Sequence, residues 1–303
     1  MRPSTLFSSF CLVALTASCS QAQSDQPTQA ATPASSPKAT KGGDRRRDKT
    51  AAAQIAGLRR VGSLKGVVPE SSGLCPAPQP GTYYSFGDDG NQPILYQLSG
   101  TGQLLGQLEL GVPNVDWESL SRDDQGNYYI GDCGNNESLR RDLTLYRLRP
   151  DQPQQIQKIT FRYPDQTEFP PLKKKQRNFD CEASLWHAGQ VYLFTKDRGQ
   201  DRESKVYAVP AEPGDYTAKL VTRLAIPGEV TDAALRPDGR RLVLLGRGEL
   251  FILDGNSWED ILKASPRQVS LAGAGQTEGC AFKDTNTLLI STEQGALFEY
   301  QLP

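Results

Sequence analysis

From about residue 56 onward, short apolar runs alternate with breaks that are rich in Gly, Asp, Asn and Pro. Runs such as those at 128–131 and 241–246 are too short for helices of three turns. They are rich in branched and aromatic residues, which favour strands. No stretch has the spacing of a long amphipathic helix. The pattern therefore predicts an all-β protein.

One motif recurs along this part of the chain: an acidic residue begins a short run of small and apolar residues. Its copies are PESSGL (69–74), DWESL (116–120), DCEASL (180–185), TDAAL (231–235) and TEGCAF (277–282). The corresponding acidic residues, 46 to 64 positions apart, are Glu70, Glu118, Glu182, Asp232 and Glu278. We interpret each motif as the first strand of a structural repeat.

A second and a third apolar run follow each motif, and a fourth fits before several of the next ones. Four strands in a repeat of roughly 40–50 residues are typical of a β-propeller blade. The sequence predicts five blades of four antiparallel strands, and the run at 56–66 is expected to complete the last blade. Six blades are the alternative, because the longest interval contains the insertion at 163–178.

The first strand of each blade lines the channel of a propeller, so the five acidic residues are expected to converge at one mouth. Clustered carboxylates must be protonated, paired with bases or neutralised by a cation. A ring of oxygen ligands suits Ca²⁺ better than Mg²⁺ or Na⁺. The alternative is a channel start in which the acids bind backbone amides and water.

The loops between second and third strands are expected to open at the same mouth. They carry the candidate ligand-binding residues Asp89, Asn91, Asp132, Asn135, Arg140, Lys196 and Arg198.

Charge and residue composition argue against several classes of function. The net charge is −1 and no basic stripe with interleaved aromatics occurs, so nucleic acid is not an expected partner. The single histidine, His187, reads as a turn residue, which argues against catalysis by a histidine base. Widely spaced cysteines at 75, 133, 181 and 280 argue against a zinc site, and a Cys133–Cys181 disulfide stays open.

The beginning of the chain indicates export. Residues 1–18 have the pattern of a signal peptide, and the small residues before Cys19 resemble a bacterial lipobox. This resemblance to lipoprotein precursors implies a lipid on Cys19 and anchoring to a bacterial membrane, the outer one expected. An ordinary cleaved signal peptide is the alternative. Residues 19–52 are predicted to be a disordered tether, and 53–303 a monomeric propeller.

Two families share motifs with the chain. ESSGL followed by DWESL is similar to the inner strands of the SdiA-regulated family of bacterial propellers. With YYIGDCGNN, NFDCEASL and VYLFTKDR, residues 60–303 resemble uncharacterised exported proteins and lipoproteins of the Bacteroidota. A weaker likeness, to calcium-activated apyrases, implies axial calcium held by Ser71, Glu118, Glu182 and Glu278. None of these resemblances establishes an activity.

The favoured function is a tethered propeller that binds a ligand or partner protein at the acidic mouth. The alternative is a metal-dependent hydrolase of phosphate esters or nucleotides, with Asp116 or Asp180 as the base. A metal-free carboxylate pair that acts on a glycoside is a third possibility.

Overall fold

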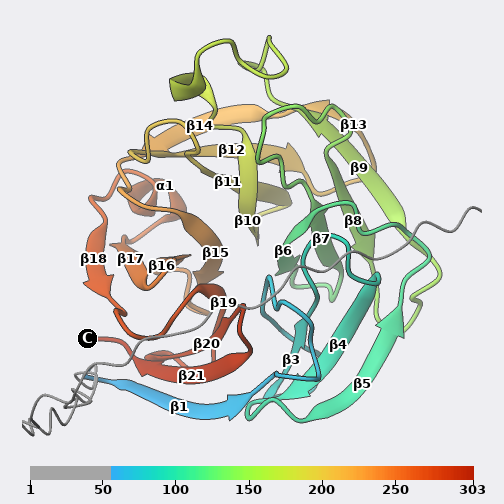
Figure 1. Ribbon diagram of the computed structural model, residues 1–303, viewed down its shortest axis with the longest axis vertical. Coiled ribbons are helices and arrows are strands. Elements are labelled where there is room, and N and C mark those ends of the chain that lie inside the picture. Colours follow the sequence, from blue (N-terminus) through green and yellow to red (C-terminus); the bar gives the residue numbers. More distant parts are fainter. Residues whose placement is uncertain (1–55) are drawn as a thin grey trace, which may run out of the picture. The chain divides into compact units, whose positions relative to one another are not determined.

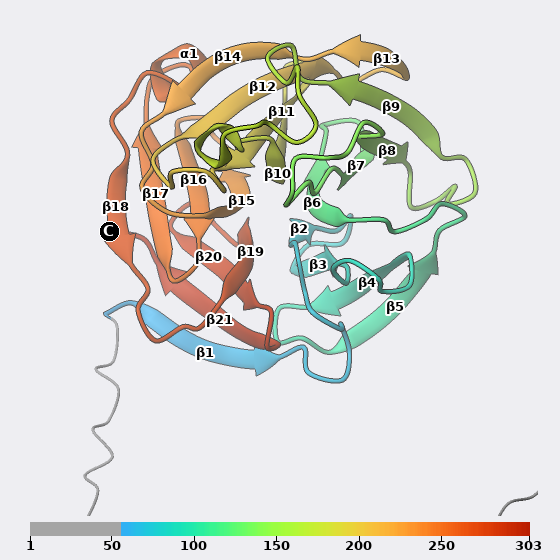
Figure 2. The same cartoon turned by 45° about the horizontal axis from the view of Figure 1, so that its top comes forward.

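The computed structural model describes residues 56–303, which form a ring of five β-sheets around a central channel (Figure 1). Each sheet is a blade whose first strand lies at the channel and whose last strand lies at the rim (Figure 2). The predicted signal peptide, Cys19 and the tether lie outside the described residues. No helix of the described part is long and apolar enough to span a membrane.

In the first three blades, the strands follow one another in space from the channel to the rim. The first blade contains β2 (Cys75–Pro76), β3 (Thr82–Ser85), β4 (Ile94–Ser99) and β5 (Leu104–Glu109). The second contains β6 (Trp117–Arg122), β7 (Tyr128–Asp132), β8 (Thr144–Leu148) and β9 (Gln157–Arg162). The third contains β10 (Asp180–His187), β11 (Gln190–Lys196), β12 (Ser204–Pro210) and β14 (Lys219–Leu224).

The last two blades complete the ring in the same order of strands. The fourth contains β15 (Val230–Leu235), β16 (Arg241–Gly246), β17 (Glu249–Asp254) and β18 (Arg267–Ser270). The fifth contains β19 (Thr277–Phe282), β20 (Thr287–Thr292), β21 (Ala296–Gln301) and β1 (Leu58–Ser63). The antiparallel pairing of β1 with β21 joins the two ends of the described chain and covers an open sheet edge. The prediction of five blades closed by terminal strands is thus confirmed.

Some elements depart from the expected pattern. β13 (Gly214–Thr217) adds a fifth strand to the second blade and runs parallel to β9, although it lies between β12 and β14 in sequence. The insertion at 163–178 forms no blade and contains only the short 3₁₀ helix η1 (Lys174–Gln176). The helix α1 (Trp258–Ile261) connects β17 to β18. Because the insertion at 163–178 contains no strand, it adds no sixth blade, and the alternative of six blades is excluded.

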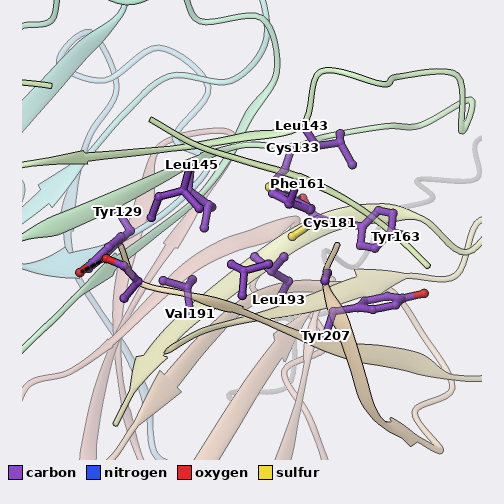
Figure 3. Close-up of a cluster of buried hydrophobic side chains, with 14 of the residues drawn as sticks. Tyr129, Cys133, Leu143, Leu145, Phe161, Tyr163, Cys181, Val191, Leu193 and Tyr207 are labelled. Atoms are coloured by element: carbon purple, nitrogen blue, oxygen red, sulfur yellow. Dashed lines mark hydrogen bonds between the residues drawn. The ribbon is translucent and has the colours of Figure 1, made fainter. Parts of the chain in front are cut away.

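Most buried apolar side chains pack in clusters between neighbouring blades. Figure 3 shows one such cluster, in which Tyr129 and Leu145 of the second blade meet Val191, Leu193 and Tyr207 of the third. All five side chains are buried. Burial of this kind between successive blades holds the inner strands in place around the channel.

Four of the five inner strands contain a β-bulge at an equivalent position. The pairing register shifts on either side of Glu118 in β6, Glu182 in β10, Thr231 in β15 and Glu278 in β19. A bulge inserts one extra residue into a strand and re-aims its side chain. Equivalent bulges therefore position equivalent side chains around the channel, and three of them are glutamates.

Candidate functional site at the acidic mouth

A polar cavity of about 200 Å³ lies where the inner strands begin. Its lining includes the bulge residues Glu118, Glu182 and Glu278, each at least 93% buried, together with Ser72. We call this cavity the acidic mouth. Three of the five acidic residues predicted to converge are therefore brought together around the channel.

The structure does not place Glu70 in this group. The bridge between Ser71 and Gly87 corresponds to the pair of Trp117 and Asp132, so Ser72 takes the place of Glu118 in the first blade. Ser72 Oγ donates a hydrogen bond of 3.1 Å to Glu118. Glu70 is exposed, with a φ of 46°, and accepts a bond from Asn91. The prediction was wrong because it aligned the motifs on their first acidic residue.

Asp232 is also not at the mouth. The bulge of β15 is at Thr231, so Asp232 lies one residue further along and is 1% exposed. Its carboxylate accepts bonds from the backbone N–H groups of Ala233 (2.8 Å) and Cys280 (2.7 Å). Burial raises the pKa of this carboxyl well above its usual value. Asp232 therefore ties the fourth blade to the fifth and is not available to an ion at the mouth.

Basic side chains neutralise one half of the acidic mouth. Glu182 contacts both Lys196, at 3.1 Å, and Arg198, at 2.8 Å. Arg198 also bonds Asp180 at 2.6 Å. Burial disfavours a charged lysine, but Glu182 and the nearby Glu229 outweigh it and raise the pKa of Lys196. Lys196 therefore serves as a counter-charge for Glu182 and Glu229.

Arg247 extends this paired half across the fourth and fifth blades. Its Nε lies 3.3 Å from Glu278 and 3.2 Å from Glu229. Burial, reinforced by Glu182, still raises the pKa of Glu278 to about 7. The carboxylates of the third to fifth blades thus lie in a network with Lys and Arg side chains, and no metal ion is required to balance their charge.

The other half of the mouth has no such partners. Carboxylate oxygens of Asp88, Asp116 and Glu118 all lie within 4.8 Å of one another; Asp88 and Glu118 line the cavity, and Asp116 lies directly beside them. Within residues 56–303, no Lys or Arg nitrogen comes within 4.0 Å of these three side chains. Burial raises the pKa of Asp116 to about 6, although the charge of the more distant Arg140 acts in the opposite direction, and burial also raises the pKa of Glu118. This cluster, which we call the carboxylate triad, can be relieved by protons or by a cation.

A glycine makes room for the triad. A Cβ atom on Gly134 would lie 2.3 Å from Cγ of Asp116 and 2.4 Å from its Oδ2. The carboxylate of Asp116 therefore lies directly on the backbone of the loop that follows β7. All donors at the triad are oxygens, the chemistry that Ca²⁺ prefers.

Three of the predicted ligand-binding residues have structural partners instead. Asp132 accepts bonds from the backbone N–H of Asp116 (3.1 Å) and from Arg140 (2.9 Å). Asn135 donates its N–H to Asp180 at 2.6 Å and accepts one from Arg140 at 2.9 Å. These bonds fix the loop that carries Gly134 and join the second blade to the third.

The other predicted ligand-binding residues divide into two groups. Lys196 and Arg198 line the acidic mouth. Asp89 is exposed and Asn91 is half-buried beside Glu70, so neither lines the cavity.

Several groups at the mouth were not singled out from the sequence. They include Arg247 and Glu229, which reach the channel from loops of the fourth blade. The only sequence signal for Arg247 is its position, because it directly follows the second strand of its blade and Arg198 lies just after the corresponding strand β11. The four cysteines within residues 56–303 are free thiols, so Cys133 and Cys181 do not form a disulfide; the Sγ of Cys133 instead lies 3.5 Å from the carbonyl oxygen of Cys181.

No protein-family model and no curated protein matches this chain. Glutaminyl cyclase from Myxococcus xanthus has a similar structure, with a TM-score of 0.51 and 13% identity over 80% of this chain and 93% of that one. The PQQ-bound aldose sugar dehydrogenase from Streptomyces coelicolor has a TM-score of 0.47 and 14% identity, over 80% and 96%. Both are β-propeller proteins, and at such identities the likeness of the cyclase supports the fold alone. The SdiA-regulated and lipoprotein resemblances remain predictions, and the chain is a five-bladed β-propeller.

Proposed function

We propose that this protein is an exported, lipid-anchored propeller that binds a divalent cation at the carboxylate triad and, through it, a ligand at the acidic mouth. Calcium is the ion that we expect. Cys19 and the tether would hold the propeller at a bacterial membrane. The mouth would then act as a binding site and not as a catalytic centre.

One observation carries this proposal, which is the unequal distribution of charge around the mouth. Glu182 and Glu278 have basic partners, whereas Asp88, Asp116 and Glu118 have none within 4.0 Å in the described chain. Three carboxylates held together without a basic group in direct contact cost free energy unless they share protons or bind a cation. Without a bound ion, these three carboxylates would destabilise the fold by mutual repulsion and burial.

The donor set favours calcium over other metals. Ca²⁺ takes about six to eight oxygen ligands in flexible geometry. The triad offers up to six carboxylate oxygens, and water or a ligand can complete the shell. No histidine or cysteine lies among its members, which argues against zinc. Mg²⁺ demands a stricter octahedral arrangement and keeps more of its own water.

A metal-dependent hydrolase is less well supported. Both oxygens of Asp180 are occupied, by the N–H of Asn135 and by Arg198, so it is a poor general base. Asp116 is the other candidate base, and it belongs to the proposed cation site. If Asp116 is a ligand of the cation, neither of the two predicted bases is free to act as one.

Calcium titration of a soluble form that begins at Lys49 tests the proposal. All five interblade cores and the closing strand β1 lie within 56–303, so this form retains the folded ring. Isothermal calorimetry is expected to give one calcium per chain, and chelator is expected to lower the melting temperature. The paired change Asp116→Asn and Glu118→Gln should reduce calcium affinity at least about 100-fold.

The matched control is Asp151→Asn, which removes an exposed carboxylate that pairs with Arg149. This variant should bind calcium as the unchanged protein does. Identical melting with calcium and with chelator would contradict the proposal. Turnover of nucleotides or phosphate esters that depends on calcium would favour the hydrolase instead.

A further inference from the structure

A second and larger cavity lies at the other end of the channel. The later parts of all five inner strands, with the turns that follow them, enclose about 630 Å³. It shares no lining residue with the acidic mouth. We call it the opposite mouth. Cavities of roughly 300–1,000 Å³ are typical of small-molecule sites.

Apolar side chains from three blades line the opposite mouth. Leu185 of β10, Leu235 of β15 and Phe282 of β19 each pack against an interblade core but remain only half-buried. The small side chains of Ala233 and Ala234 leave space beside them. An apolar molecule that covered the exposed parts of these three side chains would be stabilised by their burial.

Two hydroxyls supply hydrogen-bonding capacity on the wall. Ser184 Oγ donates to Ser121 Oγ at 3.3 Å, and both side chains are at least 97% buried. Neither hydroxyl has another hydrogen-bond partner within residues 56–303. Each serine can donate one bond and accept two, so capacity remains for a polar group of a ligand.

One cation at the rim has no acidic partner. Arg122 is exposed, and within the described chain no carboxylate oxygen lies within 4.0 Å of it; its NH1 contacts the carbonyl of Ala77 at 3.4 Å. By contrast, Arg236 is paired with Asp238 at 2.8 Å. The neighbouring Asp123 is occupied by four hydrogen bonds within its own turn and β7. Arg122 is thus available to an anionic group.

We propose that the opposite mouth binds a small, largely apolar molecule that carries one acidic group, such as a medium-chain or aromatic carboxylic acid. The apolar body lies against Leu185, Leu235 and Phe282. The acidic group lies near Arg122 or the paired serines. This site is separate from the acidic mouth and does not depend on the proposed cation.

A matched pair of fluorescent probes tests this proposal on the soluble form from Lys49. Anilinonaphthalene sulfonate has an apolar aromatic body and one negative charge, whereas phenylnaphthylamine has the same body without the charge. Both are expected to bind saturably at one site per chain, with chelator or calcium making no difference. Arg122→Gln should weaken the sulfonate about fivefold and leave the neutral probe unchanged.

Two further variants complete the design. Leu235→Glu places a charge in the apolar wall and should weaken both probes about tenfold or more. Leu185→Gln, from another blade, replaces it if the first variant does not fold by circular dichroism. Asp124→Asn removes an exposed acid at the same rim and should strengthen sulfonate binding slightly. Non-saturable binding, or sulfonate binding that folded wall variants and Arg122→Gln leave unchanged, would overturn the proposal.

Discussion

Removal of the Asp232 side chain tests the distinction between structural and ion-binding carboxylates. The motif of the fourth blade suggests that Asp232 belongs with Glu118 and Glu182, but the structure ties it to the backbone of two blades. Asp232→Ala should therefore destabilise the propeller and leave calcium affinity unchanged. The two properties can be measured separately on the same preparation.

The size of the effect follows from the two bonds that are lost. The substitution leaves the N–H groups of Ala233 and Cys280 buried without an acceptor. Each unsatisfied group costs roughly 1–3 kcal/mol, partly offset because a buried carboxyl is no longer desolvated. We expect a loss of about 3 kcal/mol in the free energy of unfolding. For a domain of this size, that corresponds to a melting temperature lower by roughly 6–12 °C.

Denaturant unfolding followed by circular dichroism gives the stability, and calorimetry gives the calcium affinity. Asp151→Ala is the control, because its carboxylate is exposed and pairs only with Arg149. A loss of under about 1 kcal/mol would show that the two backbone bonds do not hold the blades together. A large drop in calcium affinity with little loss of stability would return Asp232 to the ion site and refute the reasoning.

Three other outcomes are expected. In calcium-free protein, burial raises the pKa of Asp116 from 3.8 to about 6 and also raises that of Glu118, so the folded state holds protons that the unfolded chain releases. Stability should therefore fall as the pH rises from about 4 to 7. Saturating calcium should reduce this slope in melting curves, and the remaining slope comes from groups outside the triad such as Glu278, whose pKa is raised to about 7. Gly134→Ala should displace the Asp116 carboxylate and weaken calcium binding about tenfold in calorimetry, whereas Gly111→Ala, whose Cβ would have no atom closer than 3.9 Å, should not. Deletion of 56–63 exposes the edge of β21 and should abolish a single cooperative unfolding transition; a transition that stays unchanged would show that β1 does not close the ring.

The architecture was predictable because a blade repeats several signals at once. Each copy combines an acidic start, period-two apolar runs and turn residues, so the loss of one signal in one copy did not hide the repeat. The added strand β13 was not foreseen. It pairs with a blade that precedes it in the chain, and nothing in its own four residues indicates that partner.

The site was predicted only in part, because a bulge shifts side chains by one residue without a mark in the sequence. Aligning TDAAL on its acid placed Asp232 beside Glu182, although Thr231 occupies the bulge. In the first blade, aligning on the second strand instead would have matched Ser72 with Glu118. The pairing of charges across blades, as between Arg247 and Glu278, depends on loop positions that a single sequence does not encode visibly.

Anomalous diffraction from crystals of the soluble form grown with calcium tests the central claim most directly. We expect one strong peak within bonding distance of Asp88, Asp116 and Glu118, displaced from the channel centre toward the first and second blades. A peak shared equally by Glu118, Glu182 and Glu278, or no peak at the acidic mouth, would contradict it.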